Sequence, residues 1–123
     1  MSSRKQTGDD GEHAVVAFLL ERDFVLLARN WRHGRHEIDI VARKTDLLVL
    51  VEVRTRAPGA PVVGLASVDA KKRAHLLRAA ELFALHELPK HAGLTRMRID
   101  VAGVSFGPGG AEVHYAEGAI SAS

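Results

Sequence analysis

Hydrophobic residues recur at helical spacing in two segments of the chain, with polar residues between them. The first segment runs from Gly11 to about Arg22, and the second covers residues 69–87. Their expected N-cap residues are Asp9 or Asp10 for the first and Ser67 or Asp69 for the second. We therefore predict two amphipathic helices, the second ending near Pro89 and Gly93.

Short apolar or alternating runs between and after these segments predict strands. The runs are Phe24–Ala28, His36–Arg43, Leu47–Arg54, Met97–Phe106 and Ala111–Tyr115. The run beginning at Leu47 is apolar on both sides of its pleat, which is typical of a strand buried on both faces. KTD and GPGG are the expected hairpin turns. The basic segment RNWRHGR is expected to be a connector that turns at Gly34, and APGAPVVGLAS a loop.

Composition narrows the class of protein. Hydrophobic residues make up 46% and charged residues 26% of 123 residues, which are values typical of one globular domain. We expect residues 1–7 to be a flexible leader and residues 8–120 to form that domain. The chain has no cysteine, which excludes disulfides, thiolate zinc sites and cysteine nucleophiles. No apolar run approaches the roughly 20 residues of a membrane span, and no secretory signal is visible, so we expect a cytoplasmic protein without a membrane partner.

Positive charge is concentrated in one part of the chain, although the net charge is only +2. Between residues 54 and 78, six cations accompany one acidic residue, Asp69. The six are Arg54, Arg56, Lys71, Lys72, Arg73 and Arg78. Such a segment suits a polyanion such as a nucleic acid. The alternative is a solvated helix face next to a basic loop.

The first hairpin carries the candidate chemistry. If its turn is centred between Thr45 and Asp46, Asp39 lies opposite Glu52, while Glu37 lies opposite Arg54. Opposed carboxylates repel, and a charge at the end of a core strand costs free energy unless it is paired. A Mg²⁺ or Mn²⁺ ion between the two carboxylates would remove both costs. The alternative is that Glu52 pairs with a neighbouring arginine and Asp39 caps a loop or lies in solvent.

The run EIDIVARKTDLLVLVEVRTR resembles the catalytic hairpin of the PD-(D/E)xK nuclease superfamily. GEHAVVAFLLERDFVLLARNWR, VDAKKRAHLLRAAELFA, MRIDVAGV and VHYAEGAI follow the order and spacing of one small bacterial branch, the YraN-like family of uncharacterised proteins. The resemblance covers residues 8 to 120. It implies the αβββαβ core of archaeal Holliday-junction resolvases, which is an α/β fold with a central mixed sheet flanked by helices.

The resemblance also implies a ligand set for the metal. Asp39 matches the metal-binding aspartate of the motif and Glu52 its second acidic ligand, and the backbone carbonyl of Val53 would complete the set. Glu12 matches an acidic residue that reaches the metal in the resolvases.

Two positions depart from the pattern that the resemblance implies. Arg54 occupies the position of the motif lysine, and arginine stays protonated, so it cannot act as a general base. His36 replaces the glycine of a GEID signature, in which Glu37 is the acidic residue.

The resemblance also implies a role for Lys71, which falls where related nucleases carry a polar or basic helper.

Aromatic, basic and histidine residues offer two further candidate binding groups. Trp31 lies among arginines and can stack on an unpaired base, although a tryptophan after an apolar strand is more often a core residue. The candidate DNA-contacting residues are Arg29, Trp31, Arg32, Arg35, Arg56, Lys72 and Arg73. The seven histidines show no zinc-binding spacing on a helix.

Together these features predict a Mg²⁺- or Mn²⁺-dependent endonuclease that hydrolyses DNA, with branched or processed DNA and a homodimer implied by the resolvase resemblance. The main alternative is a weakened or inactive nucleic-acid-binding module that keeps the nuclease fold, with Arg54 as the cause. A third alternative is a protein-interaction adaptor, for which no salt-dependent binding of DNA is expected.

Overall fold

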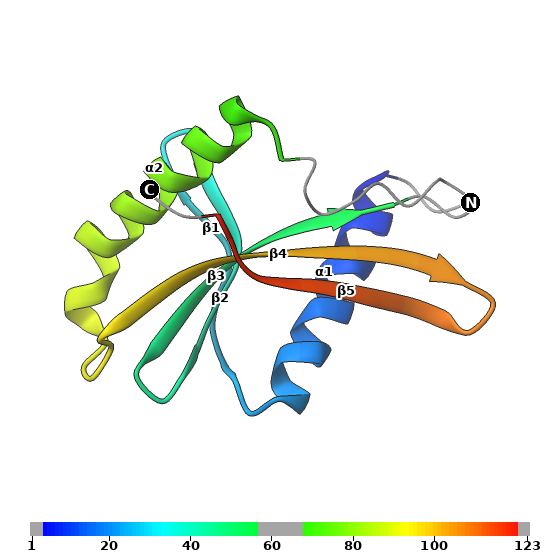
Figure 1. Ribbon diagram of the computed structural model, residues 1–123, viewed down its shortest axis with the longest axis horizontal. Coiled ribbons are helices and arrows are strands. Elements are labelled where there is room, and N and C mark those ends of the chain that lie inside the picture. Colours follow the sequence, from blue (N-terminus) through cyan, green and yellow to red (C-terminus); the bar gives the residue numbers. More distant parts are fainter. Residues whose placement is uncertain (1–3, 57–67, 121–123) are drawn as a thin grey trace.

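The computed structural model describes residues 4–56 and 68–120 (Figure 1). In chain order the elements of this part are α1 (Arg4–Glu21), β1 (Val25–His33), β2 (His36–Lys44), β3 (Leu47–Thr55), α2 (Ala70–Glu87), the short 3₁₀ helix η1 (Leu88–Lys90), β4 (Arg96–Gly107) and β5 (Gly110–Ile120). The predicted order of helix, three strands, helix and two strands is confirmed.

The five strands form one sheet whose spatial order follows the chain, β1-β2-β3-β4-β5. Neighbouring strands are antiparallel except β3 and β4, which are parallel. Parallel neighbours need a long crossover connection, and α2 lies in the connection between these two strands. The fold is therefore the predicted α/β arrangement with a mixed sheet, to which β5 adds a fifth strand at the edge.

One helix covers each face of the sheet (Figure 1), and two separate clusters of buried side chains result. On one face, Leu76 and Phe83 of α2 pack with Leu48 and Leu50 of β3. On the other face, Val15 and Leu19 of α1 pack with the β3 valines between and after those leucines. The apolar run of β3 is thus buried on both faces, as its sequence predicts.

The first helix begins earlier than its hydrophobic pattern indicated. α1 starts at Arg4, so the expected start at Gly11 is wrong, and Asp9 and Asp10 lie inside the helix rather than at its cap. Residues 4–7, expected to belong to a leader, are helical, and residues 1–3 lie outside the described part. The residues before Gly11 are polar and show no apolar stripe, which is the signal that such predictions depend on.

The first strand is longer than predicted. β1 continues to His33, so Arg29, Trp31 and Arg32 belong to a strand rather than to a connector. These polar residues pair with β2, for example Arg32 with Glu37, and only the turn at Gly34 lies where it was expected. The loop over residues 57–67 and the candidate cap Ser67 lie outside the described part, and Asp69 caps α2 by accepting a hydrogen bond from the Lys72 amide.

Neither α1 nor α2 has the continuous apolar length that crossing a bilayer requires, and this holds for the whole described part of the chain.

A buried carboxylate holds β4 and β5 together where their register shifts. Asp100 is fully buried and accepts hydrogen bonds from Arg98 Nε and Nη2 at 2.8 and 3.0 Å, the Tyr115 hydroxyl at 2.5 Å and the Gly118 amide at 2.8 Å. Ile99 pairs with Ile120, whereas Val101 pairs with Ala116, so β5 has more residues than β4 between these two pairs. Burial and the bond to Asp100 raise the pKa of Tyr115 far above its usual range. Asp100 therefore accepts from the Gly118 amide in this irregular part of the ladder and ties it to the side chains of Arg98 and Tyr115.

Replacing Asp100 with alanine removes the acceptor shared by three donor residues. We expect Asp100→Ala to lower the free energy of unfolding by about 3 kcal/mol, measured by urea denaturation. Glu117→Gln is the control, because Glu117 lies 3.6 Å from Arg98 but is largely exposed, and its loss should cost less than about 0.5 kcal/mol. Equal effects of the two substitutions would contradict a structural role for Asp100.

Candidate functional site

The hairpin of β2 and β3 has the register that its sequence predicted. The turn is centred between Thr45, which has a positive φ of 53°, and Asp46. Paired residues run from Lys44 with Leu47 to Ile40 with Val51, and the ladder ends there. The two strands separate beyond this point, so polar side chains enter where backbone pairs would otherwise continue.

Asp39 is the first residue past the end of the ladder, and its side chain bonds to the neighbouring strand. Its Oδ2 accepts a hydrogen bond of 2.8 Å from the Val53 amide. The carboxylate thus replaces a backbone carbonyl as the partner of β3. Since the β2–β3 ladder ends at Ile40 and Val51, the expected pair of Glu37 with Arg54 does not form. Glu37 Oε2 instead lies 3.3 Å from Arg32 Nη2 on β1.

The half-buried Asp39 carboxyl lies in a negative environment. Burial raises its pKa from 3.8 to about 7, and the nearby charges of Glu52, Glu12 and Glu37 act in the same direction, with that of Glu52 the largest of the three. The hydrogen bond from Val53 opposes this rise only in part. A cation beside Asp39 and Glu52 would relieve the repulsion between them.

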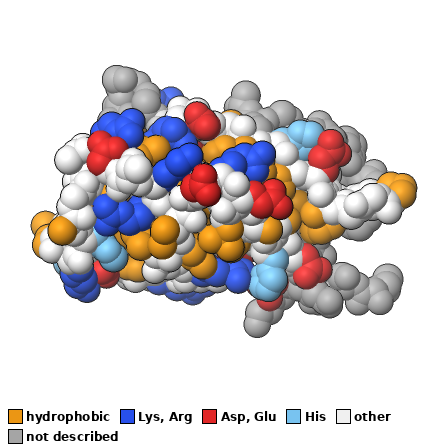
Figure 2. Space-filling view, turned by 90° about the horizontal axis from the view of Figure 1, so that it is seen from below, with side chains coloured by type: hydrophobic (Ala, Val, Ile, Leu, Met, Phe, Trp, Pro, Cys, Tyr) orange, Lys and Arg blue, Asp and Glu red, His pale blue; other side chains and the backbone are white. Residues whose placement is uncertain are grey.

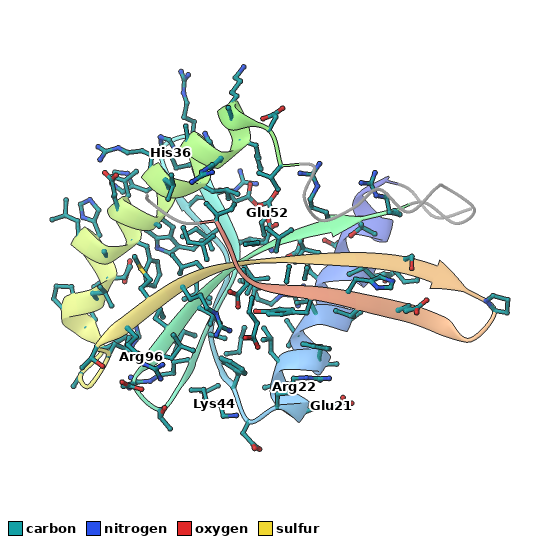
Figure 3. The ribbon with its side chains drawn as sticks, viewed as in Figure 1. Glu21, Arg22, His36, Lys44, Glu52 and Arg96 are labelled. Carbon is teal, nitrogen blue, oxygen red and sulfur yellow. The ribbon has the colours of Figure 1, made fainter. Side chains whose placement is uncertain are left out.

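Glu52 contacts α2 through an ion pair. Its Oε1 lies 3.1 Å from Nζ of Lys72, and only 12% of the Glu52 side chain is exposed. Figure 3 shows Glu52 on β3 near the N-terminal end of α2. Val51 and Val53 belong to the cluster on the α1 side, so the predicted alternation, with Glu52 on one face and these valines on the other, is confirmed.

A pocket of about 450 Å³ opens where β3 ends and α2 begins. Its lining residues are Glu52, Val53, Arg54, Thr55, Arg56, Asp69 and Lys72. Arg54 and Arg56 are half-buried, and within residues 4–56 and 68–120 neither guanidinium has an ion-pair partner. Two unpaired cations in a pocket with one acidic ligand candidate make it a suitable place for an anionic group.

Glu12 approaches the site from α1, which lies unusually close to the end of β3. A Cβ atom on the preceding residue, Gly11, would lie 2.1 Å from Thr55 Oγ1, so only glycine permits this approach. Glu12 Oε1 is buried without a hydrogen-bond partner, and Arg29 Nη2 lies 3.7 Å from it. Burial raises the pKa of Glu12, and the charge of Arg29 partly offsets this effect.

The carboxylates fit a hard divalent cation, but not as a closed cage. In the described part of the chain, no three Asp, Glu or His side chains gather tightly enough to hold a metal ion by themselves. Glu12 therefore does not join Asp39 and Glu52 as a third close ligand. Mg²⁺ and Mn²⁺ sites that act on phosphates commonly use one or two carboxylates and take their other ligands from water and substrate, so two carboxylates beside the Val53 carbonyl are compatible with such an ion.

The lysine that reaches the site is Lys72 rather than Lys71. Lys71 is exposed, whereas Lys72 contacts Glu52 and lines the pocket. Lys72 lies one helical turn before Leu76 and shares a face with the buried Phe83. The sequence predicted Lys72 only as a DNA-contacting residue. Extending the apolar stripe of the predicted helix back by one turn would also have placed it beside Glu52.

The predicted DNA-contacting residues of β1 are engaged within the fold. Arg29 also contacts His13, with 3.2 Å between Nη2 and Nδ1. The Trp31 ring packs edge-on against Phe83, and its indole N–H donates to Glu87, which agrees with a core role. Of the remaining predicted residues, Arg35 and Arg73 are exposed, in the β1–β2 turn and on α2 respectively.

His36, which stands where the GEID signature has glycine, contacts α2. Its ring stacks on His75 at a centroid distance of 4.4 Å, and its Nδ1 atom is buried without a hydrogen-bond partner. The labelled His36 lies beside α2 in Figure 3. The substitution thus adds a contact between the start of β2 and the helix that carries Lys72.

Charge elsewhere on the surface is mixed. On the face shown in Figure 2, basic and acidic side chains alternate with apolar ones and do not form a uniformly basic surface. Some exposed charges are paired with each other, for example Arg96 with Asp46 at 2.8 Å.

Comparison with known proteins identifies the family. A model of the uncharacterised protein family UPF0102 matches residues 11–104. A UPF0102 protein of Sorangium cellulosum is 44% identical over 108 residues, covering 88% of this chain and 75% of that protein. A UPF0102 protein of Roseiflexus castenholzii is 45% identical over 105 residues, covering 85% of this chain and 82% of that protein. A UPF0102 protein of Synechococcus sp. is 38% identical over 118 residues, covering 94% of this chain and 86% of that protein. The chain belongs to the UPF0102 family, which confirms the expected YraN-like membership.

The close approach of α1 to β3 predicts opposite effects for two glycines of the same helix. Gly11→Ala should lower the free energy of unfolding by about 1–3 kcal/mol, because the new Cβ collides with Thr55. Gly8→Ala should raise it by about 0.5–1 kcal/mol, because nothing lies within 4 Å of that position and alanine favours helix. Thermal and urea denaturation measure both effects. Thr55→Ala should relieve most of the Gly11→Ala cost, and additive effects of the two substitutions would contradict the contact.

The raised pKa of Asp39 predicts a pH-dependent stability in the absence of divalent cations. The folded protein binds the Asp39 proton more tightly than the unfolded chain, so this stabilisation is complete below pH 3.8 and is lost as the pH rises through about 7. Asp39→Asn retains an acceptor for the Val53 amide and removes the charge. In EDTA, its melting temperature relative to wild type should therefore rise between pH 5 and pH 8. A constant difference across this range would show that Asp39 titrates normally.

Proposed function

We propose that this protein is a metal-dependent nuclease of the PD-(D/E)xK type that hydrolyses phosphodiester bonds in DNA. The observation that carries the proposal is the Asp39 carboxylate, held 2.8 Å from the Val53 amide beside a second carboxylate, Glu52, whose charge helps to raise the pKa of Asp39. Two like charges fixed together at the end of a core strand are costly in an isolated fold and useful in a cation site. Membership in UPF0102 is compatible with this activity and does not specify it.

Asp39 and Glu52 would hold a Mg²⁺ or Mn²⁺ ion, with the Val53 carbonyl as a further oxygen ligand. When bound, such an ion lowers the pKa of a coordinated water and neutralises charge on the scissile phosphate. Glu12 would attract the ion from a longer distance through its negative charge, which also acts on Asp39. Its buried Oε1 has no hydrogen-bond partner in the described residues.

Arg54 and Arg56 would bind the phosphate. Both line the pocket that Glu52 also lines, which puts permanent positive charge beside the proposed cation site. In the reaction water attacks phosphorus, the bond from phosphorus to one ester oxygen breaks, and that oxygen leaves with a proton. Arg54 would stabilise the charge that develops on the phosphate, and because it stays protonated it would not remove the proton from water.

The proposed substrate is DNA, with branched or processed DNA favoured by the resemblance to resolvases. A four-way junction has two strands to cut, so a homodimer with two sites would suit it. The exposed Arg35, in the turn between β1 and β2, would contact the DNA backbone outside the pocket.

Cleavage of labelled linear duplex, single-stranded and four-way-junction DNA, with Mg²⁺ or Mn²⁺, tests the proposal. We expect metal-dependent cleavage by the wild type and a loss to below about 1% in Asp39→Ala and Glu52→Gln. Lys71→Met, at an exposed position of α2, is the control and should retain cleavage. Cleavage that survives Asp39→Ala would place the activity elsewhere or in a contaminant.

A second function is supported by Arg54 itself. With arginine at the position of the motif lysine, the protein can be a nucleic-acid-binding module that has lost turnover. Arg54→Lys separates the two functions, since a weakened enzyme should cut faster with lysine. DNA binding that weakens with salt, together with no cleavage by either form, would favour the binding module.

A further inference from the structure

The three cations that line the pocket differ in whether they have an ion-pair partner among the described residues. Arg54 lies on β3, and Arg56 is the first residue after this strand. The Arg56 amide continues the pairing with β4 by donating a hydrogen bond of 2.8 Å to the Val104 carbonyl. Within the described residues neither has an ionic partner, whereas Lys72 is bound to Glu52. The pocket therefore holds two cations ready for an anion and a third that is occupied by a carboxylate.

We propose that Glu52 exchanges Lys72 for the divalent cation, and that the released Lys72 then joins Arg54 and Arg56 on a substrate phosphate. This inference rests on the proposed function, and it makes Lys72 a residue that couples metal binding to DNA binding.

The geometry around Glu52 supports the exchange. The Lys72 ammonium lies 3.1 Å from Glu52 Oε1, in contact with the carboxylate that the cation would need. Two cations on one largely buried carboxylate repel each other, and this repulsion favours the departure of one when the other binds. Lys72 is suited to leave, because its charge is a compact ammonium on a flexible four-carbon stem and 41% of its side chain is exposed.

The pocket gives the released ammonium a destination. Lys72 and both arginines line the same cavity, so a phosphate between the guanidiniums lies within the region that the lysine side chain can reach. Arg54 and Arg56 are two residues apart on extended chain, about 7 Å along its axis, which leaves room for a phosphate and its neighbouring atoms. Metal binding would thus raise the affinity for DNA, and by linkage DNA would raise the affinity for metal by the same factor.

The experiment measures this coupling without relying on catalysis. A short fluorescent DNA duplex with hydrolysis-resistant phosphorothioate linkages is titrated with protein by anisotropy, in EDTA and in Mn²⁺, and Mn²⁺ is titrated calorimetrically with and without the duplex. The proteins compared are wild type, Lys72→Met and Lys71→Met, with Asp39→Ala as the blank for Mn²⁺ bound by DNA alone. The two methionine variants lose the same charge at adjacent positions of α2, and circular dichroism checks their folding.

We expect Mn²⁺ to tighten DNA binding about 10-fold in the wild type and in Lys71→Met, and less than about 2-fold in Lys72→Met. Lys72→Met should bind Mn²⁺ alone at least as tightly as the wild type, because the competing ammonium is absent. Equal coupling in the two methionine variants overturns the exchange and leaves the nuclease proposal to the cleavage assay. A wild type that binds no Mn²⁺ overturns both proposals.

Discussion

One hydrogen bond, from the Val53 amide to the Asp39 carboxylate, fixes the site on which the proposed chemistry depends. It forms where the β2–β3 ladder ends, so a side chain takes the place of a backbone partner. The β3 residues before it are buried on both faces and cannot shift to relieve a repulsion at their end. The core consequently holds the carboxylates of Asp39 and Glu52 close together. Their mutual repulsion costs free energy, and a positive charge beside them would reduce this cost.

Helix α2 supplies positive charge to this pair, whereas α1 brings a further carboxylate, Glu12, whose charge also raises the pKa of Asp39. On the α1 side, the absence of a side chain at Gly11 brings Glu12 and its partner Arg29 close to the end of β3. On the α2 side, Lys72 neutralises Glu52 directly. Since both contacts converge on the last residues of β3, this end of the sheet is where charge, space and packing constraints meet.

The sequence was sufficient to predict the parts of the fold that follow from hydrophobic period and turn length. A two-residue turn at Thr45 fixes the pairing of Ile40 with Val51, and strand alternation then assigns Glu52 to its face. The first turns of α1 and the second half of β1 were missed because polar residues there carry no periodic signal. The partners of Glu37 and Asp100 depend on where the β2–β3 ladder ends and on the bulge in β5, which are properties of the assembled sheet and not of either strand alone.

The three cations that line the pocket are divided between the end of β3 and α2. A guanidinium is a permanent, planar donor that suits phosphate, while a compact ammonium that can change partners is better supplied by lysine. Here the strand carries the guanidiniums and α2 carries the ammonium. The position of Lys72 therefore depends on how α2 is anchored, and the anchors are the packing of Phe83 on Trp31 and the stacking of His75 on His36. Through its stack on His75, His36 thereby helps to hold the helix that carries Lys72.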